Sequence, residues 1–340
     1  MKNKQLAINQ FSDTIDVATQ VIESEIPKIG TDEVLVRNQY VGIIALYDRE
    51  LYRGNVPYIN VIFPYVYGVE AVGEVVDLGK NLIGIKIGDA VSTVKVGTAY
   101  QEYQSIPEKD AVSIPKATPE YLTLNPTGVS AYLALKNVAE LKPEDTIVVS
   151  AAAGGLGHII VQLAKQKGCH VVGICGNEEK VVLLNSLNSC DRIINHREED
   201  IDTVLSSEFD GKINVGFDSV GRHMFDAFLK NLAPLGRLVV SGLATEINEG
   251  HFEKINAPRV YESIYWKGAS VRCFMNHLYK DQHPEARRFL IDQYQKGNLQ
   301  VKVDPMKFKG IEAIVDASKY LLAGKSCGKV VVELKNLSKI

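Results

Sequence analysis

The sequence contains few residues that could form disulfides or hold a transition metal. Only 5 of its 340 residues are cysteines, the first of them is Cys169, and no two show Cys-x-x-Cys spacing. The first 157 residues also contain no histidine. These absences argue against a disulfide framework and against a sulfur-rich zinc site. We expect five buried or half-buried thiols in a reducing compartment.

Long hydrophobic runs and a strong net charge are also absent. No apolar stretch approaches the roughly 18 residues of a membrane-spanning helix, and the start of the chain lacks the apolar segment of a signal peptide. The net charge of −3 would not recruit nucleic acid or an anionic membrane. We therefore predict a cytoplasmic protein with no nucleic-acid or membrane partner. Residues Ser338–Ile340 differ from the peroxisomal ending Ser-Lys-Leu by one residue, which leaves a peroxisomal location as the alternative.

The first third of the chain has the pattern of short strands. Valine- and isoleucine-rich runs at 32–43, 68–79 and 88–96 are separated by glycines and do not alternate with long helical patterns. This favours an antiparallel barrel or sandwich over an open parallel sheet. Helical spacing then appears over 117–141.

From residue 145 the pattern alternates between strands and helices. A strand at 145–150 precedes a helix at about 156–167, and a second strand at 170–175 precedes a helix at about 178–187. Further strands are expected at 191–196, 213–219, 235–242 and 269–274. Such alternation predicts a parallel, doubly wound sheet with right-handed crossovers. Two helices, 284–296 and about 309–323, and a strand at 328–334 close the chain and are expected to rejoin the first domain.

A run of small residues joins the first strand of this sheet to its helix. Ala152, Gly154 and Gly157 stand at the three positions of a G-x-G-x-x-G turn, and Gly155 adds a further glycine. A pyrophosphate could approach the backbone at the start of the helix, near Leu156, where free N–H groups and the positive end of the helix dipole lie. A glycine-rich turn without a ligand is the alternative. The strand before it and the helix and strand after it favour dinucleotide binding.

The end of the second strand lacks the acid that holds the ribose of NAD. Cys175, Gly176 and Asn177 occupy that place, and Lys180 follows. An ammonium group can pair with a 2′-phosphate, which a carboxylate would repel. The sequence therefore favours NADPH over NADH. Glu178 and Glu179 are interpreted as solvent-facing acids in the first turn of the next helix.

With these motifs in view, the chain resembles the medium-chain dehydrogenase/reductase superfamily, in its zinc-independent branch of quinone oxidoreductases and prostaglandin reductases. The segments that carry the resemblance are YGVEAVGEVVDLG, YLTLNPTGVSAYLAL, AAAGGLGHIIVQLAK, CDRIINH, VGFDSVGRHMFDAFL, LGRLVVSGL, SVRCFMNHL and CGKVVVEL. The resemblance implies an α/β protein in which residues 1–122 and 284–340 form a GroES-like β-barrel domain. Residues 123–283 would form a Rossmann NADP-binding domain, with a cleft between the two.

The resemblance also implies a set of residues that line the cofactor. His196 stands where the family usually has tyrosine at the 2′-phosphate, and Ser326 stands where a cofactor-contacting asparagine is common. The implied set is Thr127, Gly154, Gly155, Leu156, Gly157, Gly176, Lys180, His196, Ser219, Ser241, Cys273, Phe274, Met275, Asn276 and Ser326.

No zinc is expected. Val69 stands where the metal enzymes of the superfamily have histidine beside Glu70, so the Lewis acid for alcohol oxidation is missing. The family also has an active-site asparagine where this chain has Ile44. Tyrosines crowd this region, and Tyr47 and Tyr52 are candidates for supplying the missing polar group. Barrel packing is the alternative for most of these tyrosines.

The activity implied by the resemblance is hydride transfer from NADPH to the β-carbon of an apolar α,β-unsaturated ketone. Two alternatives stay open: a quinone reductase, and an NADPH-binding protein with little turnover. Phe274, Met275 and Tyr265 are candidates for an apolar substrate wall, with core packing as the alternative for each. The resemblance also implies a homodimer formed by edge-strand pairing near Ala269–Phe274.

Overall fold

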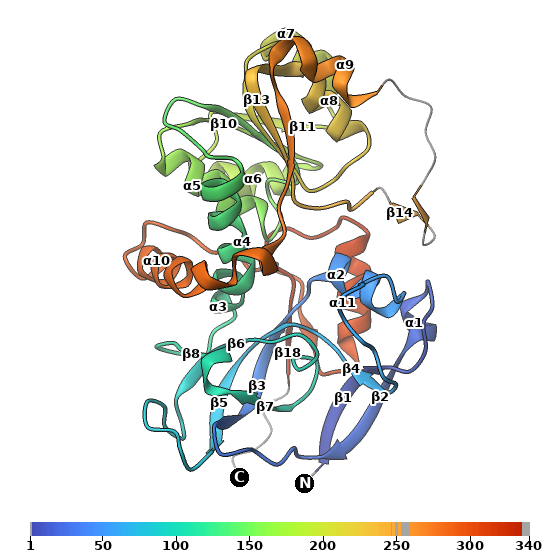
Figure 1. Cartoon of the computed structure of the whole chain (residues 1–340), viewed down its shortest axis with the longest axis vertical. Helices are drawn as coiled ribbons and strands as arrows, with labels where there is room; N and C mark the ends of the chain where they lie inside the picture. The colour runs from blue at the N-terminus through green and yellow to red at the C-terminus, as the bar shows by residue number, and fades with distance from the viewer. Residues whose placement is uncertain (1, 246, 249–250, 253–258, 335–340) are drawn as a thin grey trace. The chain divides into compact units, whose positions relative to one another are not determined.

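A computed structural model describes residues 2–245, 247–248, 251–252 and 259–334. The chain divides into two compact units (Figure 1). The first unit contains residues 1–126 and 303–340, and the second contains residues 127–302. The possible peroxisomal ending at 338–340, and part of the 243–268 segment that contains Tyr265, lie outside the described residues.

The second unit is built on a parallel sheet of six described strands in the order β11-β10-β9-β12-β13-β16. This is the strand order of a doubly wound dinucleotide-binding fold, with the order reversing between β9 and β12. The strands are β9 (Thr146–Val149), β10 (His170–Cys175), β11 (Arg192–Asn195), β12 (Ile213–Asp218), β13 (Leu232–Val240) and β16 (Ser270–Cys273). The doubly wound sheet predicted from the sequence is confirmed.

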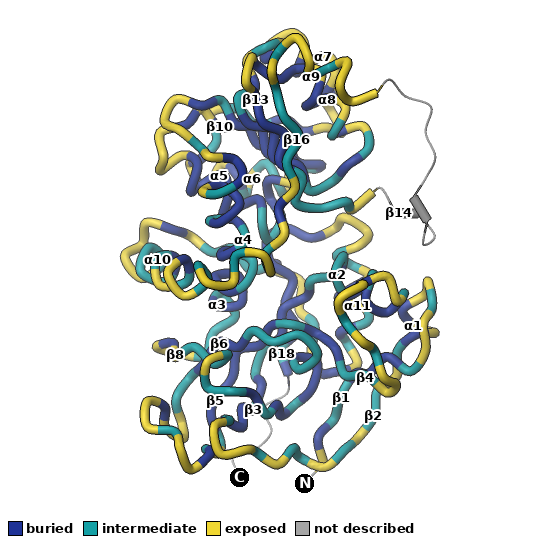
Figure 2. Tube along the Cα trace, in the orientation of Figure 1, coloured by how far each residue is buried: buried dark blue, intermediate teal, exposed yellow. Residues whose placement is uncertain are grey.

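The helices of this unit lie between these strands in the sequence, except that α4 precedes β9 and α10 follows β16. They are α4 (Gly128–Leu133), α5 (Gly157–Gln166), α6 (Glu178–Leu187), α7 (Ile201–Glu208), α8 (His223–Asn231), α9 (Val260–Ile264) and α10 (His283–Gln295). Apolar residues of α7 and α8 pack with Val148, Val172 and Ile194 into one buried cluster. Figure 2 shows that strands of this sheet are buried along most of their length. Shorter elements are η3 (Ala134–Val138), η4 (Tyr265–Lys267), η5 (Asn276–Gln282) and the hairpin of β14 (Ile247–Asn248) and β15 (His251–Phe252).

The first unit is mainly antiparallel. Its larger described sheet has the order β17-β18-β3-β5-β6-β8, with β7 also paired to β3, and its smaller sheet has the order β2-β1-β4. These strands are β1 (Lys2–Ile8), β2 (Thr19–Glu25), β3 (Glu33–Gly42), β4 (Tyr65–Val66), β5 (Glu70–Leu78), β6 (Ala90–Val94), β7 (Tyr103–Pro107), β8 (Ala111–Ser113), β17 (Phe308–Lys309) and β18 (Val331–Glu333). The predicted antiparallel first domain is confirmed, and β17 and β18 pair in parallel.

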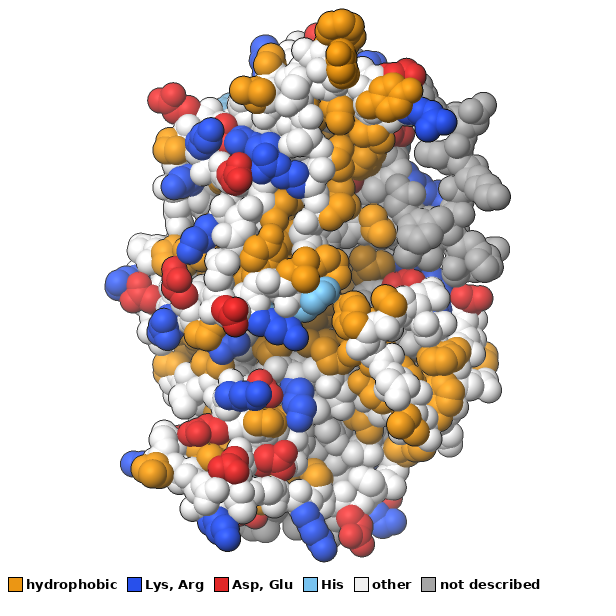
Figure 3. Space-filling model, in the orientation of Figure 1, with side chains coloured by type: hydrophobic (Ala, Val, Ile, Leu, Met, Phe, Trp, Pro, Cys, Tyr) orange, Lys and Arg blue, Asp and Glu red, His pale blue; other side chains and the backbone are white. Residues whose placement is uncertain are grey.

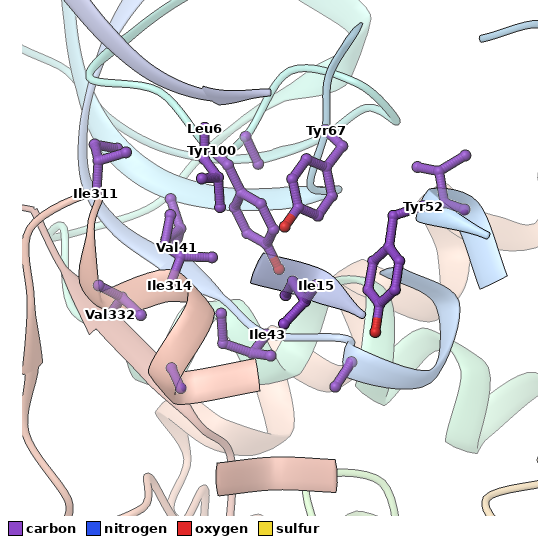
Figure 4. Packing of buried hydrophobic residues seen from close by; sticks show 14 of the residues in the cluster. Leu6, Ile15, Val41, Ile43, Tyr52, Tyr67, Tyr100, Ile311, Ile314 and Val332 are labelled. Carbon is purple, nitrogen blue, oxygen red and sulfur yellow. The ribbon is translucent and has the colours of Figure 1, made fainter. Parts of the chain in front are cut away.

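Helices of the first unit are α1 (Ile15–Ala18), α2 (Ala45–Tyr52), α3 (Glu120–Leu122) and α11 (Ala313–Leu322), with short turns η1 (Glu108–Asp110) and η2 (Thr123–Thr127), which ends at the unit boundary. Side chains of α2 and α11 share a buried cluster with β1, β3 and β18 (Figure 4). Tyr67 and Tyr100 meet edge to face in this cluster, with ring centroids 4.9 Å apart. Val332 of β18 lies in the same cluster, so the closing strand rejoins the first unit as expected.

The second boundary differs from the sequence prediction. The chain returns to the first unit at residue 303, and not at residue 284. Helix α10 stays with the second unit because it packs on α4, where the rings of Tyr132 and Phe289 lie 4.9 Å apart. A surface ion pair of 3.2 Å between Lys136 and Glu285 also joins these segments. Apolar packing contributes more to this attachment than the ion pair does, since exposed ion pairs contribute little.

Candidate dinucleotide site and a buried polar cluster

The carboxyl ends of six parallel strands lie at one edge of the sheet in the second unit, and most of the predicted cofactor residues follow these ends. In an open α/β sheet, ligands bind outside this edge, near the point where the strand order reverses. The residues found there are Gly154–Gly157 after β9, Gly176 after β10, His196 after β11, Ser219 after β12, Ser241 after β13 and Phe274–Asn276 after β16.

The glycine-rich turn has no room for a side chain at Gly157. A Cβ at this position would collide with the carbonyl oxygen of Ala151 and with the backbone of Ala152. At Gly154 a Cβ would touch only the oxygen of Ala151, at 3.2 Å. Gly157 is therefore required by the packing of helix α5 on its turn. Gly154 is nearly free of that requirement, and its lack of a side chain leaves backbone open to an approaching phosphate.

Hydroxyl groups and one carboxylate occupy the point where the strand order reverses. Ser150 donates a 2.7 Å hydrogen bond to Asp218, whose carboxylate also accepts the N–H groups of Val220 and Gly221. The hydroxyl oxygens of Ser219 and Ser241 are 2.9 Å apart. The network ties together the ends of β9, β12 and β13, so it fixes the backbone at the edge where a dinucleotide would lie.

Cationic side chains gather beyond β10 and β11. The ring of His196 covers Gly176, where a Cβ would lie 2.7 Å from Nε2. Burial lowers the pKa of His196, and the charges of Arg197 and Lys180 lower it further. The ring is therefore mainly neutral at pH 7 and can accept or donate a hydrogen bond. Asn177 caps α6 by accepting the N–H of Lys180 at 3.0 Å, which fixes the start of this lysine's helix.

The three residues that follow β16 differ in how far they are buried and in what they contact. Phe274 is buried and stacks on Tyr279 at 5.6 Å, so it packs in the core. Asn276 donates a 2.5 Å hydrogen bond to Ser130 of α4, the helix that Thr127 precedes. Met275 is 43% exposed, so for it a core-packing role is wrong.

Two further sequence expectations are corrected at this edge. Cys273 is exposed, whereas all five thiols were expected to be buried or half-buried. It lies in β16, the last strand of the sheet, which no described strand covers on its outer side. Tyr265 of η4 is 71% exposed, so core packing is wrong for this residue also.

The remaining candidates lie in the first unit. Ser326 is buried shortly before β18. Tyr52 is also buried, and burial raises the pKa of Tyr47 and Tyr52. Both phenols therefore keep their proton at neutral pH. Such groups are better suited to donate a hydrogen bond to a developing oxyanion than to give up a proton.

A buried ion pair in this unit is not predicted by any pattern in the sequence. Lys329 and Glu70 form a salt bridge with side chains that are only 4% and 0% exposed. Lys329 also donates a 3.2 Å hydrogen bond to the carbonyl oxygen of Ile43. Burial raises the pKa of Glu70 to about 7, although the ammonium group opposes this shift. A Cβ on Gly42 would overlap the Glu70 carboxylate, which explains a glycine at the end of β3.

A second buried carboxyl group lies beside this pair. Asp48 of α2 is 1% exposed and accepts a 2.5 Å hydrogen bond from the hydroxyl of Tyr100. Burial raises the pKa of Asp48 to about 7, and the Tyr100 bond and Lys329 oppose the shift. In Figure 4 the hydroxyl groups of Tyr67 and Tyr100 point toward one another, and that of Tyr52 points away from them. The charge of Glu70 also raises the pKa of Asp48, so these two buried carboxyl groups favour a proton on one of them.

The donor set at this place does not fit a catalytic zinc. Ile44 and Val69 have hydrocarbon side chains, and Glu70 is already paired with a cation. Zinc sites need three protein ligands from Cys, His, Asp or Glu. In the described ranges, no three such residues gather closely enough to hold a metal ion.

An open hollow of about 510 Å³ lies elsewhere in the first unit, near Gln39, Ser113 and Lys116. Its two carboxylates already have partners. Glu74 pairs with Arg37 at 2.8 Å, and Asp89 accepts the N–H of Lys86 at 2.8 Å. We assign no function to this hollow.

Comparison with known proteins agrees with this architecture. Residues 30–116 match the alcohol dehydrogenase GroES-like domain, and residues 155–288 match the zinc-binding dehydrogenase domain. The chain is 36% identical to mouse prostaglandin reductase-3 over 318 residues, which cover 91% of this chain and 83% of the relative. It is 31% identical to a probable quinone oxidoreductase of Leishmania amazonensis over 337 residues, which cover 98% of each chain.

A solved structure has the same fold. Escherichia coli quinone oxidoreductase complexed with NADPH aligns with a TM-score of 0.81 at 24% identity. The alignment covers 97% of this chain and 99% of that one. Within the described residues, no helix has the length and hydrophobicity needed to cross a membrane.

Proposed function

Because the chain belongs to the medium-chain dehydrogenase/reductase family, in the branch of quinone oxidoreductases and prostaglandin reductases, we propose that it is an NADPH-dependent enone reductase. The proposed reaction reduces the carbon–carbon double bond of an apolar α,β-unsaturated ketone. The single observation that supports it best is the edge of the parallel sheet, where a glycine-rich turn follows β9, and Lys180 and His196 follow the neighbouring strands β10 and β11.

Each end of this edge suits one part of the cofactor. The backbone after Ala151 and the first turn of α5 would hold the pyrophosphate, since N–H groups at a helix start bind anions. Lys180 and His196 would hold the 2′-phosphate, with Arg197 adding positive charge. NADPH bound in this way supplies a hydride to the substrate. The predicted set of cofactor residues remains part of the proposal.

The protein's own chemical role in this proposal is small. Positioning and exclusion of water would provide most of the catalysis. When a hydride reaches the β-carbon, negative charge develops on the ketone oxygen, and a phenol that keeps its proton can stabilise that charge. Tyr47 and Tyr52 are the candidates, because a phenol keeps its proton at neutral pH and burial raises the pKa of both further.

The activity is tested by stopped-flow oxidation of NADPH with an enone and a quinone of similar size, measured side by side. We expect the enone to be reduced at the larger kcat/KM. A larger value for the quinone would favour the quinone reductase instead. Saturable NADPH binding without oxidation by either compound would favour a binding protein with little turnover. That alternative is kept because Ile44 stands where the family has an active-site asparagine.

Replacement of Lys180 by Ala tests the choice of cofactor. Loss of a hydrogen bond between two charged groups costs about 1.5–3 kcal/mol, so NADPH affinity should fall by roughly 10- to 150-fold. NADH affinity should change little. Lys167→Ala, at an exposed lysine just beyond α5, is the matched control. An unchanged ratio of NADPH to NADH affinity in Lys180→Ala would show that this lysine is misassigned.

We also propose a homodimer formed through β16. This strand ends the sheet of the second unit, and large hydrophobic side chains are exposed near it: Leu235 (76%), Tyr265 (71%) and Trp266 (90%). Figure 3 shows hydrophobic side chains gathered on this part of the surface. Exposed apolar patches and unpaired edge strands are typical of association surfaces. Sedimentation should give twice the chain mass of 37.5 kDa, and a monomer at micromolar concentration would contradict the proposal.

A further inference from the structure

One face of helix α5 is hydrogen-bonded to the segment Asn298–Lys302, which follows α10. Gln166 donates to the carbonyl of Asn298 at 2.6 Å. Gln162 donates to the carbonyl of Gln300 at 2.9 Å and accepts its N–H at 2.8 Å. The ring of His158 accepts the N–H of Lys302 at 3.1 Å.

The spacing of these contacts explains why they line up. Four residues advance a helix by about 6 Å, and two residues advance an extended chain by about 6.6 Å. The contacts of residues 158 and 162 with residues 302 and 300 fit this match, and the contact of residue 166 with residue 298, where the chain bends, continues the antiparallel order. Lys302 is the last residue of the second unit, so this row of bonds ends where the chain passes into the first unit.

The partners of His158 define its tautomer. The ring is fully buried, and Nδ1 lies 2.8 Å from the carbonyl oxygen of Gly154, which can only accept. Nε2 faces the N–H of Lys302, which can only donate. The imidazole is therefore neutral, with its proton on Nδ1.

The proton on Nδ1 of His158 helps to fix the direction of the Gly154 carbonyl in the glycine-rich turn. The carbonyl of Gly154 accepts both the ring proton and the backbone N–H of His158, the latter at 3.1 Å, so its direction is fixed toward α5. The peptide between Gly154 and Gly155 is trans, since the only cis bonds in the described ranges precede Pro64 and Pro126. A trans peptide holds its C=O and N–H in opposite directions. The N–H of Gly155 is therefore turned away from His158.

We propose that His158 is a positioning residue that orients the Gly155 N–H toward the cofactor pyrophosphate and, through the same ring, couples occupation of the turn to the segment Asn298–Lys302. The inference rests on the proposed dinucleotide site. It assigns no contact between His158 and the cofactor, because the ring acts through the Gly154 carbonyl.

The test compares His158→Phe, which keeps a planar ring and loses both hydrogen bonds, with His158→Gln, which keeps a donor and an acceptor. Affinities for NADPH and for adenosine 2′-monophosphate are measured by calorimetry, because the second ligand lacks the pyrophosphate. We expect His158→Phe to weaken NADPH about tenfold and to leave adenosine 2′-monophosphate within twofold. His158→Gln should recover part of the loss. A purely structural role would instead lower both affinities together.

Hydrogen exchange measures the coupling in the same proteins. In the wild type, NADPH should slow amide exchange at 298–302 as well as in the turn, and in His158→Phe only the turn should respond. Gln166→Met removes the far hydrogen bond and is the control, with NADPH affinity expected within twofold of the wild type. The inference would be overturned, with the proposed function left intact, by either of two results. One is an unchanged ratio of the affinities for NADPH and adenosine 2′-monophosphate in His158→Phe. The other is a wild type in which NADPH does not change amide exchange at 298–302. A wild type that binds no NADPH would overturn the proposed function as well.

Discussion

Replacement of Lys329 by Met should lower the free energy of unfolding by about 3–5 kcal/mol at pH 8. The substitution removes the ammonium that pairs with Glu70, and it leaves that carboxylate buried and without a cation. It also leaves the carbonyl of Ile43 without the Lys329 hydrogen bond. Chemical denaturation followed by circular dichroism measures the change.

The loss should depend on pH in a defined direction. Burial already raises the folded-state pKa of Glu70 above its ordinary value of 4.5, to about 7, and loss of Lys329 raises it further. The folded state then holds a proton that the unfolded state has released, so stability falls as pH rises from about 4.5 through the folded-state pKa. The variant should therefore be closest to the wild type near pH 5 and furthest from it at pH 8.

A double variant separates charge from packing. Glu70→Leu combined with Lys329→Met removes both charges, and it should regain most of the stability lost by Lys329→Met alone, since apolar residues can replace a buried ion pair at little cost. If Lys329→Met is as stable as the wild type at pH 8, the two side chains are not a buried ion pair in solution.

Replacement of Gly154 by Ala should weaken NADPH by about 10- to 100-fold, equivalent to roughly 1.4–2.7 kcal/mol. The added methyl group would touch only the oxygen of Ala151 within the protein, at 3.2 Å. It would nevertheless occupy the backbone surface that a pyrophosphate approaches. The variant should therefore fold normally, with a melting temperature close to that of the wild type, and calorimetry should record the loss of affinity.

Gly157→Ala is the contrasting variant. Its methyl group would collide with the backbone of Ala151 and Ala152, so the start of α5 must shift. We expect this variant to lose both stability and NADPH affinity. Equal NADPH affinity in Gly154→Ala and the wild type would mean that the phosphate does not approach this glycine.

Local patterns were sufficient to predict the second unit. Buried strands that alternate with amphipathic helices allow few topologies, and the observed strand order is the one expected for a dinucleotide-binding sheet. The expected strand at 170–175 and helix at about 178–187 agree with β10 and α6 at both ends. The glycine-rich turn and Lys180 could be named from local sequence, whereas Ser219, Ser241 and the residues from Cys273 to Asn276 were named from the family resemblance.

Contacts between distant segments could not be predicted in this way. Glu70 and Lys329 are far apart in the chain. The valine-rich sequence around Lys329 does not indicate which residue its ammonium group pairs with. Helix 284–296 has the amphipathic pattern of any surface helix, and contacts such as that of Phe289 with Tyr132 show which unit it joins. The exposure of Cys273 and Tyr265 depends on which strand lies at the sheet edge, and strand order is a property of the whole sheet.

Calorimetric titration of the purified wild-type protein with NADPH, and separately with NADH, tests the central claim most directly. The account predicts one saturable site per chain for NADPH and clearly weaker binding of NADH, because Cys175, Gly176 and Asn177 at the end of β10 place no acid at the ribose position, and Lys180 lies in the helix that follows. If titration with NADPH and titration with NADH both gave no heat of binding, and neither nucleotide competed with the other for the protein, the result would contradict the account.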